Sequence, residues 1–298
     1  MILAIDIGNT TVTLGGVRTA PQQAYSLEFT ARIDINHTWS ASQYESAIEQ
    51  LFEDKNLSPS DFQGVIISSV VPSVLTLLQE CVRNLFGTEP LLVTSESDLG
   101  MTFSIPEPEK VGRDRLVDAA WAAAHYPLPV ITVDLGTATT FNVVDENRVF
   151  RGGVICPGLS TGLRALGERC AQLPQVRLSS PKAAIGVNTE SCMLSGSVLG
   201  TAVLLDGITQ RIEEELGRPA TLVVTGGLAK YVTPLCRHPL TYDPELLLKG
   251  LALLYQMNAP QPHYAAGGRR RNPNNNFRRG RRPRSQRRER REEENKNG

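Results

Sequence analysis

The sequence predicts an α/β fold made of two similar halves, each with a phosphate-binding turn. One observation is a repeated stretch: residues 5–11, Ile-Asp-Ile-Gly-Asn-Thr-Thr, closely resemble residues 133–140, Val-Asp-Leu-Gly-Thr-Ala-Thr-Thr. Each stretch ends a short Ile- and Val-rich run, which is typical of a buried strand, and places Gly two residues after Asp. The other observation is the order of the predicted elements, β-β-β-α-β-α-β in both halves. Because the two Asp residues lie 128 positions apart, we expect a duplicated fold with the two turns facing each other.

The two turns carry the groups that phosphates and cations need. Gly8 and Gly136 let the backbone turn tightly and let a phosphate approach without a Cβ in the way. Asp6 and Asp134 are suited to hold a cation beside the phosphate oxygens. The expected donors to those oxygens, besides local backbone N–H groups, are Asn9, Thr10, Thr137 and Thr139. A single Asp-x-Gly turn occurs in many ordinary hairpins, so the repetition is what favours phosphate binding.

The first half is predicted to begin with three antiparallel strands. These strands lie at 2–7, 12–17 and 26–33, and are followed by a helix at 40–56, a strand at 64–69, a helix at 72–86 and a strand at 91–94. Pro72 is suited to open its helix. Gly15 and Gly16 indicate close backbone packing or a bulge in the second strand.

The second half repeats this order. Strands are predicted at 130–133, 139–144 and 149–155, then helices that include a long segment at 189–216, a strand at 221–224 and a closing helix at 244–257. Asn188 or Thr189 is expected to cap the long segment. The turn Thr225-Gly226-Gly227 would allow close approach of an adenosine. The resulting division is an N-terminal half at 1–115, a C-terminal half at 116–258 and a tail at 259–298.

The segment that joins the halves places an Asp between two Arg residues, in Gly112-Arg113-Asp114-Arg115. It comes just before an Ala-rich helix predicted at 119–125. One interpretation is structural, a helix-start Asp that pairs with an Arg. The other is catalytic, a carboxylate base beside cations that hold an anionic substrate. The position between the halves favours the catalytic interpretation, because ligand sites often form between domains.

The net charge of the chain is zero, but the charges are divided unevenly. Residues 259–298 hold twelve Arg, one Lys and four Glu, which leaves 18 basic against 27 acidic residues in 1–258. This tail is poor in apolar residues, so we expect it to be disordered. It would either solubilise the acidic body or bind RNA, DNA or another polyanion through salt-sensitive Arg–phosphate contacts, with Phe277 available to stack on a base.

Several classes of protein are not supported. The five cysteines are odd in number and no two are spaced Cys-x-x-Cys, which argues against a disulfide framework or zinc site and favours the cytoplasm; most are expected to be buried. Neither a Ser-His-Asp constellation nor a Walker-type P-loop is found. No signal peptide or membrane span is expected, since the most apolar run, at 246–255, is interrupted by Lys249.

Four motifs, taken in order, resemble those of the type III pantothenate kinases of the actin and sugar-kinase superfamily. They are Asp6-Ile7-Gly8-Asn9-Thr10, Gly112-Arg113-Asp114-Arg115, the stretch 134–140, and Gly152-Gly153 through Pro157-Gly158. The regions of Thr189 and Thr225-Gly226-Gly227 agree as well. The resemblance covers about residues 1–257, and Gly-x-Asp-Arg between two Asp-x-Gly turns is its specific part. It implies duplicated actin-like (ribonuclease H-like) halves with the active site in the cleft between them.

The resemblance also implies an activity, the ATP-dependent phosphorylation of pantothenate to 4'-phosphopantothenate in coenzyme A synthesis. Asp114 would be the general base, residues 112–115 and Thr189 would contact pantothenate, and Asp134 would bind K⁺ or NH₄⁺. The ATP phosphates, with Mg²⁺, would be lined by Asp6, Ile7, Gly8, Asn9, Thr10, Thr11, Val12 and Thr13, and Thr137 would also touch ATP. Members are usually homodimers with the substrate site near the interface.

One feature departs from the family pattern, and two other functions remain open. The family often has a Tyr seven residues before the Gly of Gly-x-Asp-Arg, where this sequence has Ile105, with Phe103 nearby. One alternative is another small-molecule kinase of the superfamily, which need not keep Gly-x-Asp-Arg. The other is a nucleotide-binding regulator whose basic tail contacts nucleic acid. Intact Asp6, Asp114 and Asp134 favour an enzyme.

Overall fold

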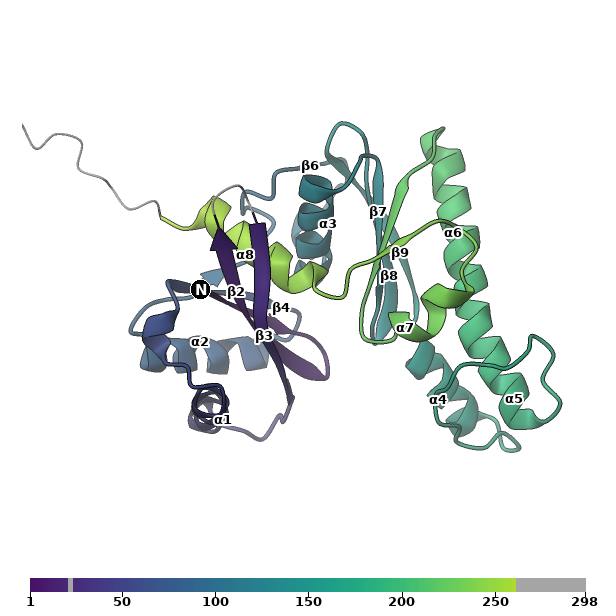
Figure 1. Cartoon of the computed structure of the whole chain (residues 1–298), viewed down its shortest axis with the longest axis horizontal. Helices are drawn as coiled ribbons and strands as arrows, with labels where there is room; N and C mark the ends of the chain where they lie inside the picture. The colour runs from purple at the N-terminus through teal and green to yellow at the C-terminus, as the bar shows by residue number, and fades with distance from the viewer. Residues whose placement is uncertain (21–23, 261–298) are drawn as a thin grey trace, which may run out of the picture. The chain divides into compact units, whose positions relative to one another are not determined.

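The computed structural model describes residues 1–20 and 24–260, and residues 1–259 form one compact unit (Figure 1). The predicted basic tail lies outside the described residues from residue 261 on. Two mixed sheets with helices on their faces make up this unit. The predicted duplicated α/β fold is therefore confirmed.

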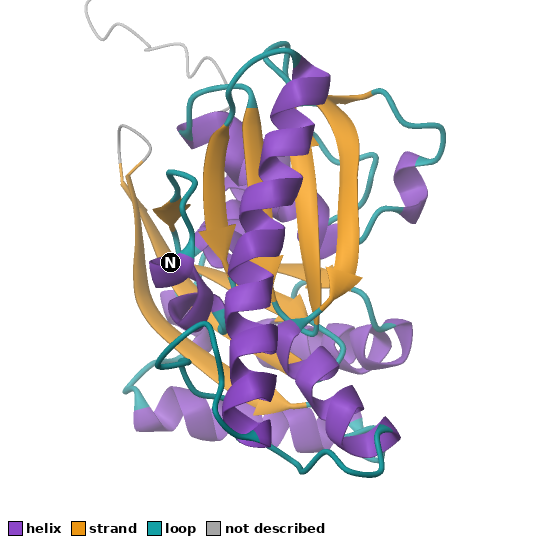
Figure 2. Cartoon of the chain, turned by 90° about the vertical axis from the view of Figure 1, so that its right-hand side faces the viewer, coloured by secondary structure: helices purple, strands orange, loops and turns teal. Residues whose placement is uncertain are grey.

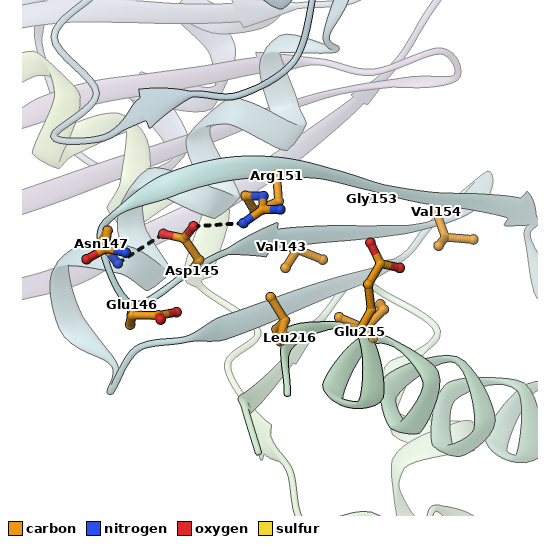
Figure 3. A pocket seen from close by; sticks show the side chains of 10 residues that line it. Val143, Asp145, Glu146, Asn147, Arg151, Gly153, Val154, Glu215 and Leu216 are labelled. Carbon is orange, nitrogen blue, oxygen red and sulfur yellow. Dashed lines mark hydrogen bonds and ion pairs between the residues drawn. The ribbon is translucent and has the colours of Figure 1, made fainter. Parts of the chain in front are cut away.

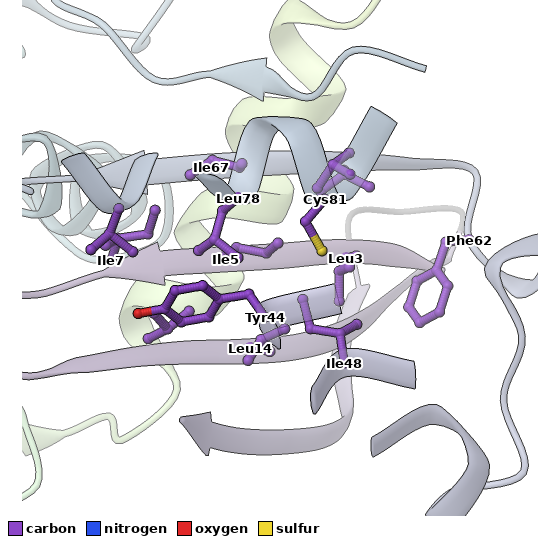
Figure 4. Close-up of a cluster of buried hydrophobic side chains, with 14 of the residues drawn as sticks. Leu3, Ile5, Ile7, Leu14, Tyr44, Ile48, Phe62, Ile67, Leu78 and Cys81 are labelled. Atoms are coloured by element: carbon purple, nitrogen blue, oxygen red, sulfur yellow. The ribbon is translucent and has the colours of Figure 1, made fainter. Parts of the chain in front are cut away.

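The first sheet has five strands in the order β3-β2-β1-β4-β5. Their bounds are β1 Ile2–Ile7, β2 Thr11–Ala20, β3 Ala24–Asp34, β4 Gly64–Ser69 and β5 Leu91–Leu92. One face of this sheet is covered by α1 (Ala41–Asp54) and α2 (Pro72–Phe86), and the side chains between them form an apolar core (Figure 4). The odd-numbered residues of β1 enter this core, whereas the even-numbered residues face the other way, toward the second half.

The second sheet has six strands in the order β11-β10-β7-β8-β9-β6. Their bounds are β6 Thr102–Phe103, β7 Val130–Leu135, β8 Ala138–Val144, β9 Val149–Pro157, β10 Thr221–Thr225 and β11 Thr241–Tyr242. The remaining helices of this half are α4 Leu159–Arg169, α5 Thr189–Leu194, α6 Gly200–Leu216 and α7 Ala229–Val232. Figure 2 shows the long helix that ends in α6 lying over one face of a sheet, roughly along its strands.

Two helices pack between the sheets, α3 (Arg113–His125) and α8 (Leu246–Asn258). α3 contacts β7, β8 and β4, whereas α8 contacts β1, β2 and β4. Gly250 lets them approach closely, because a Cβ there would lie 2.7 Å from Cγ1 of Val117. The final helix of the chain thus covers the first sheet, and β6, from residues before 115, pairs with β9. The division into 1–115 and 116–258 stays a prediction.

Several predicted elements are confirmed, with changes at their ends. Gly16 does lie at a bulge, since the β2–β3 register shifts after it, and a Cβ there would lie 2.3 Å from Phe29. Asn188 caps α5 by accepting a hydrogen bond from Ser191 N at 2.9 Å. The helix after Gly112 begins at Arg113, so Asp114 lies in its first turn rather than before it.

One sequence-based expectation is wrong, and a second, the absence of a membrane span, meets weak contrary evidence. Cys81 is buried, but Cys170 and Cys192 are exposed, so the expectation that most cysteines are buried is wrong. Within the described residues, one helical segment, Thr189–Leu216, is long and apolar enough to cross a membrane by length and composition alone. Core helices meet the same criterion, and Val198, Ala202 and Leu205 of this segment are fully buried against the second sheet. The segment is therefore weak evidence for a span.

Candidate active site

Asp6 and Asp134 occupy the same place in the two sheets. Each is the fifth residue of a six-residue strand, β1 or β7, that pairs antiparallel with the next strand in the chain. On the parallel side, Asp6 pairs with Ser68 of β4 and Asp134 pairs with Thr225 of β10. Because cross-strand partners share a face, each carboxyl projects beside a hydroxyl toward the inter-sheet helices.

The two turns that follow these carboxyls differ by one residue. In the first, Gly8 N donates to Thr11 O at 3.0 Å, and in the second Gly136 N donates to Ala138 O at 3.1 Å. The longer first turn leaves Asn9 and Thr10 exposed. This turn therefore offers more free polar groups to an anion than its counterpart.

The predicted turn Thr225-Gly226-Gly227 lies directly against Asp134. Gly226 has φ of +97°, and a Cβ there would lie 2.4 Å from Oδ1 of Asp134. Only glycine fits both this conformation and this close approach. The turn is thus held beside the second Asp-x-Gly turn.

Helix α3 brings a third carboxyl, Asp114, to the same region. Its Oδ1 accepts the backbone N–H of Arg115 at 2.8 Å, which fixes the carboxyl at the helix start. The neighbouring Arg113 is used differently, because its Nη1 donates to the carbonyls of Glu109 and Val111 at 3.0 Å each. These bonds hold the segment that leads into α3.

The pKa values show that these carboxyls share one poorly hydrated region. Burial, followed by the charge of Asp114, raises the pKa of Asp6 to about 8 and that of Asp134 to about 7. Burial also raises the pKa of Asp114, although Arg115 opposes this shift. A fourth carboxyl, Asp118, has a pKa raised well above its usual range by burial and then by the charge of Asp134. Such a cluster favours cations, which would let its members ionise together.

Asp118 was missed by the sequence analysis. It lies one helical turn after Asp114 and is only 3% exposed, and among the described residues its Oδ1 has no hydrogen-bond partner. The i, i+4 spacing could have indicated it, because residues four apart share a face of a helix. Within the described part of the chain, no group of three or more His, Cys, Asp or Glu side chains forms a ready metal site. Phosphate oxygens would therefore be needed to complete cation coordination.

Arg115 reaches across to the second sheet. Its Nε donates to Oδ1 of Asn142 at 2.6 Å, and its Nη2 donates to the carbonyl of Phe141 at 3.3 Å. Both acceptors belong to β8. The guanidinium is thus held between α3 and the sheet that carries Asp134.

A polar hollow lies away from this carboxyl cluster. It has a volume of about 320 Å³ at the far end of the β8–β9 hairpin and is lined by Val143, Asp145, Glu146, Asn147, Arg151, Gly153, Val154, Ile212, Glu215 and Leu216 (Figure 3). Asp145 pairs with Arg151 at 3.2 Å and accepts N–H bonds from Asn147 and Val149. These bonds close the hairpin. β8 begins at the Asp134 turn and ends at this hollow, so the hollow lies a full strand away from the carboxyl cluster. The carboxyl cluster contains the predicted Asp6, Asp114 and Asp134 and is therefore the better candidate site.

The sequence model of the type III pantothenate kinases matches residues 2–211. The chain belongs to this family. It shares 37% identity with a type III pantothenate kinase of an Exiguobacterium species, over 87% of this chain and 99% of the relative. It shares 35% identity with the Exiguobacterium sibiricum enzyme, over 87% of this chain and 100% of the relative. The protein is thus a transferase that phosphorylates pantothenate in coenzyme A biosynthesis, and the regulator alternative is not favoured.

Solved structures agree on the fold. One, from Campylobacter jejuni and described as a candidate Baf family transcriptional activator, has a TM-score of 0.52 and 19% identity, and covers 85% of this chain and 97% of its own. Another, described as a candidate 2-dehydro-3-deoxygalactonokinase from Sinorhizobium meliloti, has a TM-score of 0.50 and 11% identity, with coverages of 90% and 100%. These likenesses support the actin-like fold class of this pantothenate kinase.

Not all residues expected to act in this pantothenate kinase come together in one chain. Four of them lie in one region of the chain, as their pKa shifts and contacts show: Asp6, Asp114, Arg115 and Asp134. Thr189 begins α5, which packs against the segment before α6, and Figure 1 shows α5 well separated from α3. At the position of the family's Tyr, Ile105 packs in a different cluster, with Phe103 and Phe150.

A row of side chains across the first sheet adds one more residue that sequence analysis missed. Its members are successive cross-strand partners on β4, β1, β2 and β3, namely Ser68, Asp6, Thr13 and Arg32. Arg32 reaches the second half, since its Nη1 lies 3.6 Å from where a Cβ of Gly227 would be. The place of the positively charged Arg32 in this row can be recognised only once the register of the three strand pairs is known.

Proposed function

We propose that this pantothenate kinase carries out phosphoryl transfer between the two Asp-x-Gly turns, with Asp114 as the general base. The observation that carries the proposal is the convergence of Asp6, Asp114 and Asp134 from β1, α3 and β7. A primary hydroxyl is a poor nucleophile, so a carboxylate within reach assists by accepting its proton. Because burial raises the pKa of Asp114, its carboxylate is a stronger base than a solvated Asp.

ATP would bind along the first turn, with its phosphates lined by residues 6–13 and with Thr137 opposite. The exposed Asn9 and Thr10, together with the backbone N–H groups of the turn, support this placement. Phosphoryl transfer depends mainly on alignment and charge neutralisation rather than on covalent work by the protein. Mg²⁺ with Asp6 would supply part of that neutralisation.

A monovalent cation, K⁺ or NH₄⁺, would be held by Asp134. The residues fit such an ion, because the half-buried Asp134 lies near the buried Asp118, whose Oδ1 has no partner among the described residues. When bound, the cation would offset negative charge near the phosphates. The role of this chain is to present Asp134 at the end of β7 in ionised form.

Pantothenate would contact residues 112–115 and Thr189. Arg115 is suited to its carboxylate or to the transferring phosphate, since a guanidinium binds such anions with two donors. The distance between α5 and α3 within one chain supports a homodimer with the substrate site near the interface. In such a dimer, the partner's Thr189 could complete the pocket.

Outside this site, we infer a cytoplasmic enzyme with a separate basic tail. Unpaired cysteines such as Cys170 and Cys192 are compatible with a reducing compartment. The Arg-rich composition of residues 259–298 supports weak, salt-sensitive polyanion binding.

A coupled ADP-release assay on the purified full chain tests this function. Pantothenate-dependent ADP release that needs K⁺ or NH₄⁺, with 4'-phosphopantothenate identified by mass, is the expected result. ADP release that is the same without pantothenate would contradict it. Equal rates in sodium-only buffer would remove the monovalent-cation part alone.

A further inference from the structure

We propose that Asn142 is a positioning residue for Arg115. Together, Asn142, the Phe141 carbonyl and Gly153 form what we name the Arg115 seat, a surface of β8 and β9 against which the guanidinium is fixed. The proposal rests on one of the two roles proposed for Arg115, that of holding the carboxylate of pantothenate. The proposal gives a function to the buried amide of Asn142. It also gives one to Gly153, which tight packing alone would otherwise explain.

The contacts of Asn142 leave its side chain one orientation. Arg115 Nε can only donate a hydrogen bond, so the atom 2.6 Å from it must be the amide oxygen. The amide nitrogen then faces Thr132 Oγ1 at 3.1 Å, where the hydroxyl accepts. With 0% of its surface exposed, Asn142 has no water to exchange for these partners. The amide is therefore a fixed acceptor for Arg115.

Gly153 provides the space in which the guanidinium lies. It is the cross-strand partner of Asn142, and a Cβ on it would lie 3.0 Å from Nη2 of Arg115 and 1.7 Å from the Phe141 carbonyl oxygen. A larger residue would thus collide with one member of the seat and crowd the side chain that the seat holds. This explains why the second glycine of the Gly152-Gly153 motif stands on β9.

The seat uses only one side of the guanidinium. Nε and Nη2 each give one N–H to β8, out of the five that the group carries. The other N–H of Nη2 and one N–H of Nη1 form the end of the fork, and the described residues give Nη1 no hydrogen-bond partner. An end-on pair of this kind matches the two oxygens of a carboxylate or phosphate. Fixing the opposite side reduces the freedom that Arg115 must lose when it binds an anion.

This arrangement predicts an effect on one substrate only. Without the Asn142 acceptor, the guanidinium of Arg115 keeps its charge but is no longer held in one orientation. A misplaced binding group of this kind lowers kcat/KM by about 10–100-fold. The loss should fall on kcat/KM for pantothenate. The KM for ATP should stay within about 2-fold, because the first Asp-x-Gly turn, to which most of the proposed ATP contacts belong, lies on the other sheet.

Three variants test the proposal by ADP release, with each substrate varied in turn and thermal unfolding recorded. Asn142→Leu removes the acceptor at similar volume and should lower kcat/KM for pantothenate about 10–100-fold. Asn142→Asp keeps an acceptor for Nε, and Thr132 can donate to it, so it should stay within about 3-fold of wild type. Thr132→Val is the matched control, since it breaks the other bond of the amide and leaves the Arg115 contact in place.

Each outcome of these assays either supports or overturns the proposal. Equal losses in Asn142→Leu and Asn142→Asp, or a loss shared by ATP and pantothenate, would mean a structural role and would overturn the proposal. Arg115→Leu separates the proposal from the proposed function. If Arg115→Leu lowers kcat/KM for pantothenate and Asn142→Leu does not, the seat is wrong and the role of Arg115 stands. If Arg115→Leu itself leaves that value unchanged, the proposed role of Arg115 fails and the seat falls with it.

Discussion

Asp6 and Asp134 are equivalent residues of the two sheets, and each lies beside a hydroxyl on the neighbouring parallel strand. The equivalence does not extend to the turns that follow, because the first is one residue longer and more open. Duplication therefore supplies two carboxyls of raised pKa, and we propose that the change in turn length suits them to different tasks. We assign the phosphates to the first turn and the monovalent cation to the second.

The buried carboxyls should make the ligand-free enzyme less stable as the pH rises. A carboxyl whose pKa is higher in the folded than in the unfolded chain binds more protons when folded, so the free energy of unfolding falls as pH rises between the two values. For Asp6 this window runs from 3.8 to about 8, and for Asp134 from 3.8 to about 7. Urea unfolding without nucleotide should show this decline between pH 4 and pH 8.

Asp6→Asn is the variant that isolates this effect. At pH 7 and without ligand, it should raise the free energy of unfolding by roughly 1–3 kcal/mol, because a carboxyl with a folded pKa of about 8 must take up a proton on folding and an amide need not. The gain should shrink as the pH falls toward 3.8, the pKa of Asp6 in the unfolded chain, because the unfolded chain then also binds the proton. A variant that is less stable than wild type at pH 7 would contradict the raised pKa of Asp6 in the folded chain.

Asp134→Ala should abolish the response to K⁺ along with most activity. The carboxyl lies near the end of β7, beside the proposed phosphate site, where it is suited to hold a cation. Initial rates in KCl, NH₄Cl and NaCl at constant ionic strength would check this for both proteins. Full activity of the wild-type enzyme in NaCl alone would contradict the assignment.

Removal of the tail should leave the kinase intact, but the point of truncation matters. Asn258 exchanges two hydrogen bonds with the backbone of Asp98, at 2.7 and 2.8 Å. A chain that ends at Met257 loses both, so it should be about 1–2 kcal/mol less stable than one that ends at Ala259. Both should keep kinase activity, which thermal unfolding and ADP release would establish.

The same truncated chains test the tail itself. Filter binding of RNA at low and high salt should show retention by the full chain at low salt only, because counterion release drives such contacts. Equal retention by the chain that ends at Ala259 would rule out polyanion binding by the tail. Loss of kinase activity in that chain would show that the tail is not separate from the enzyme.

The duplicated fold could be predicted because its signal is local. Short apolar runs followed by Asp-x-Gly mark both β1 and β7, and Pro72 marks the start of α2. Asp114 could be predicted as a site residue because its motif lies between the halves. These features depend on sequence order alone.

The rest of the site depends on pairing between distant segments. Arg32 joins the row of Asp6 only through the register of β2 and β3, and Asn142 meets Arg115 only because α3 packs on β8. The burial of Asp118 depends on both sheets closing over α3. No short-range pattern encodes such contacts, because they are fixed by tertiary packing.

Turnover of the Asp114→Asn enzyme tests the central claim most directly. The amide keeps the size of the side chain and cannot accept the proton, so kcat for pantothenate-dependent ADP release should fall roughly 10²–10⁴-fold. Thermal unfolding and the KM for ATP should stay near their wild-type values, which would show that the fold and the nucleotide site are intact. A folded Asp114→Asn enzyme with near wild-type turnover would contradict the assignment of Asp114 as the base.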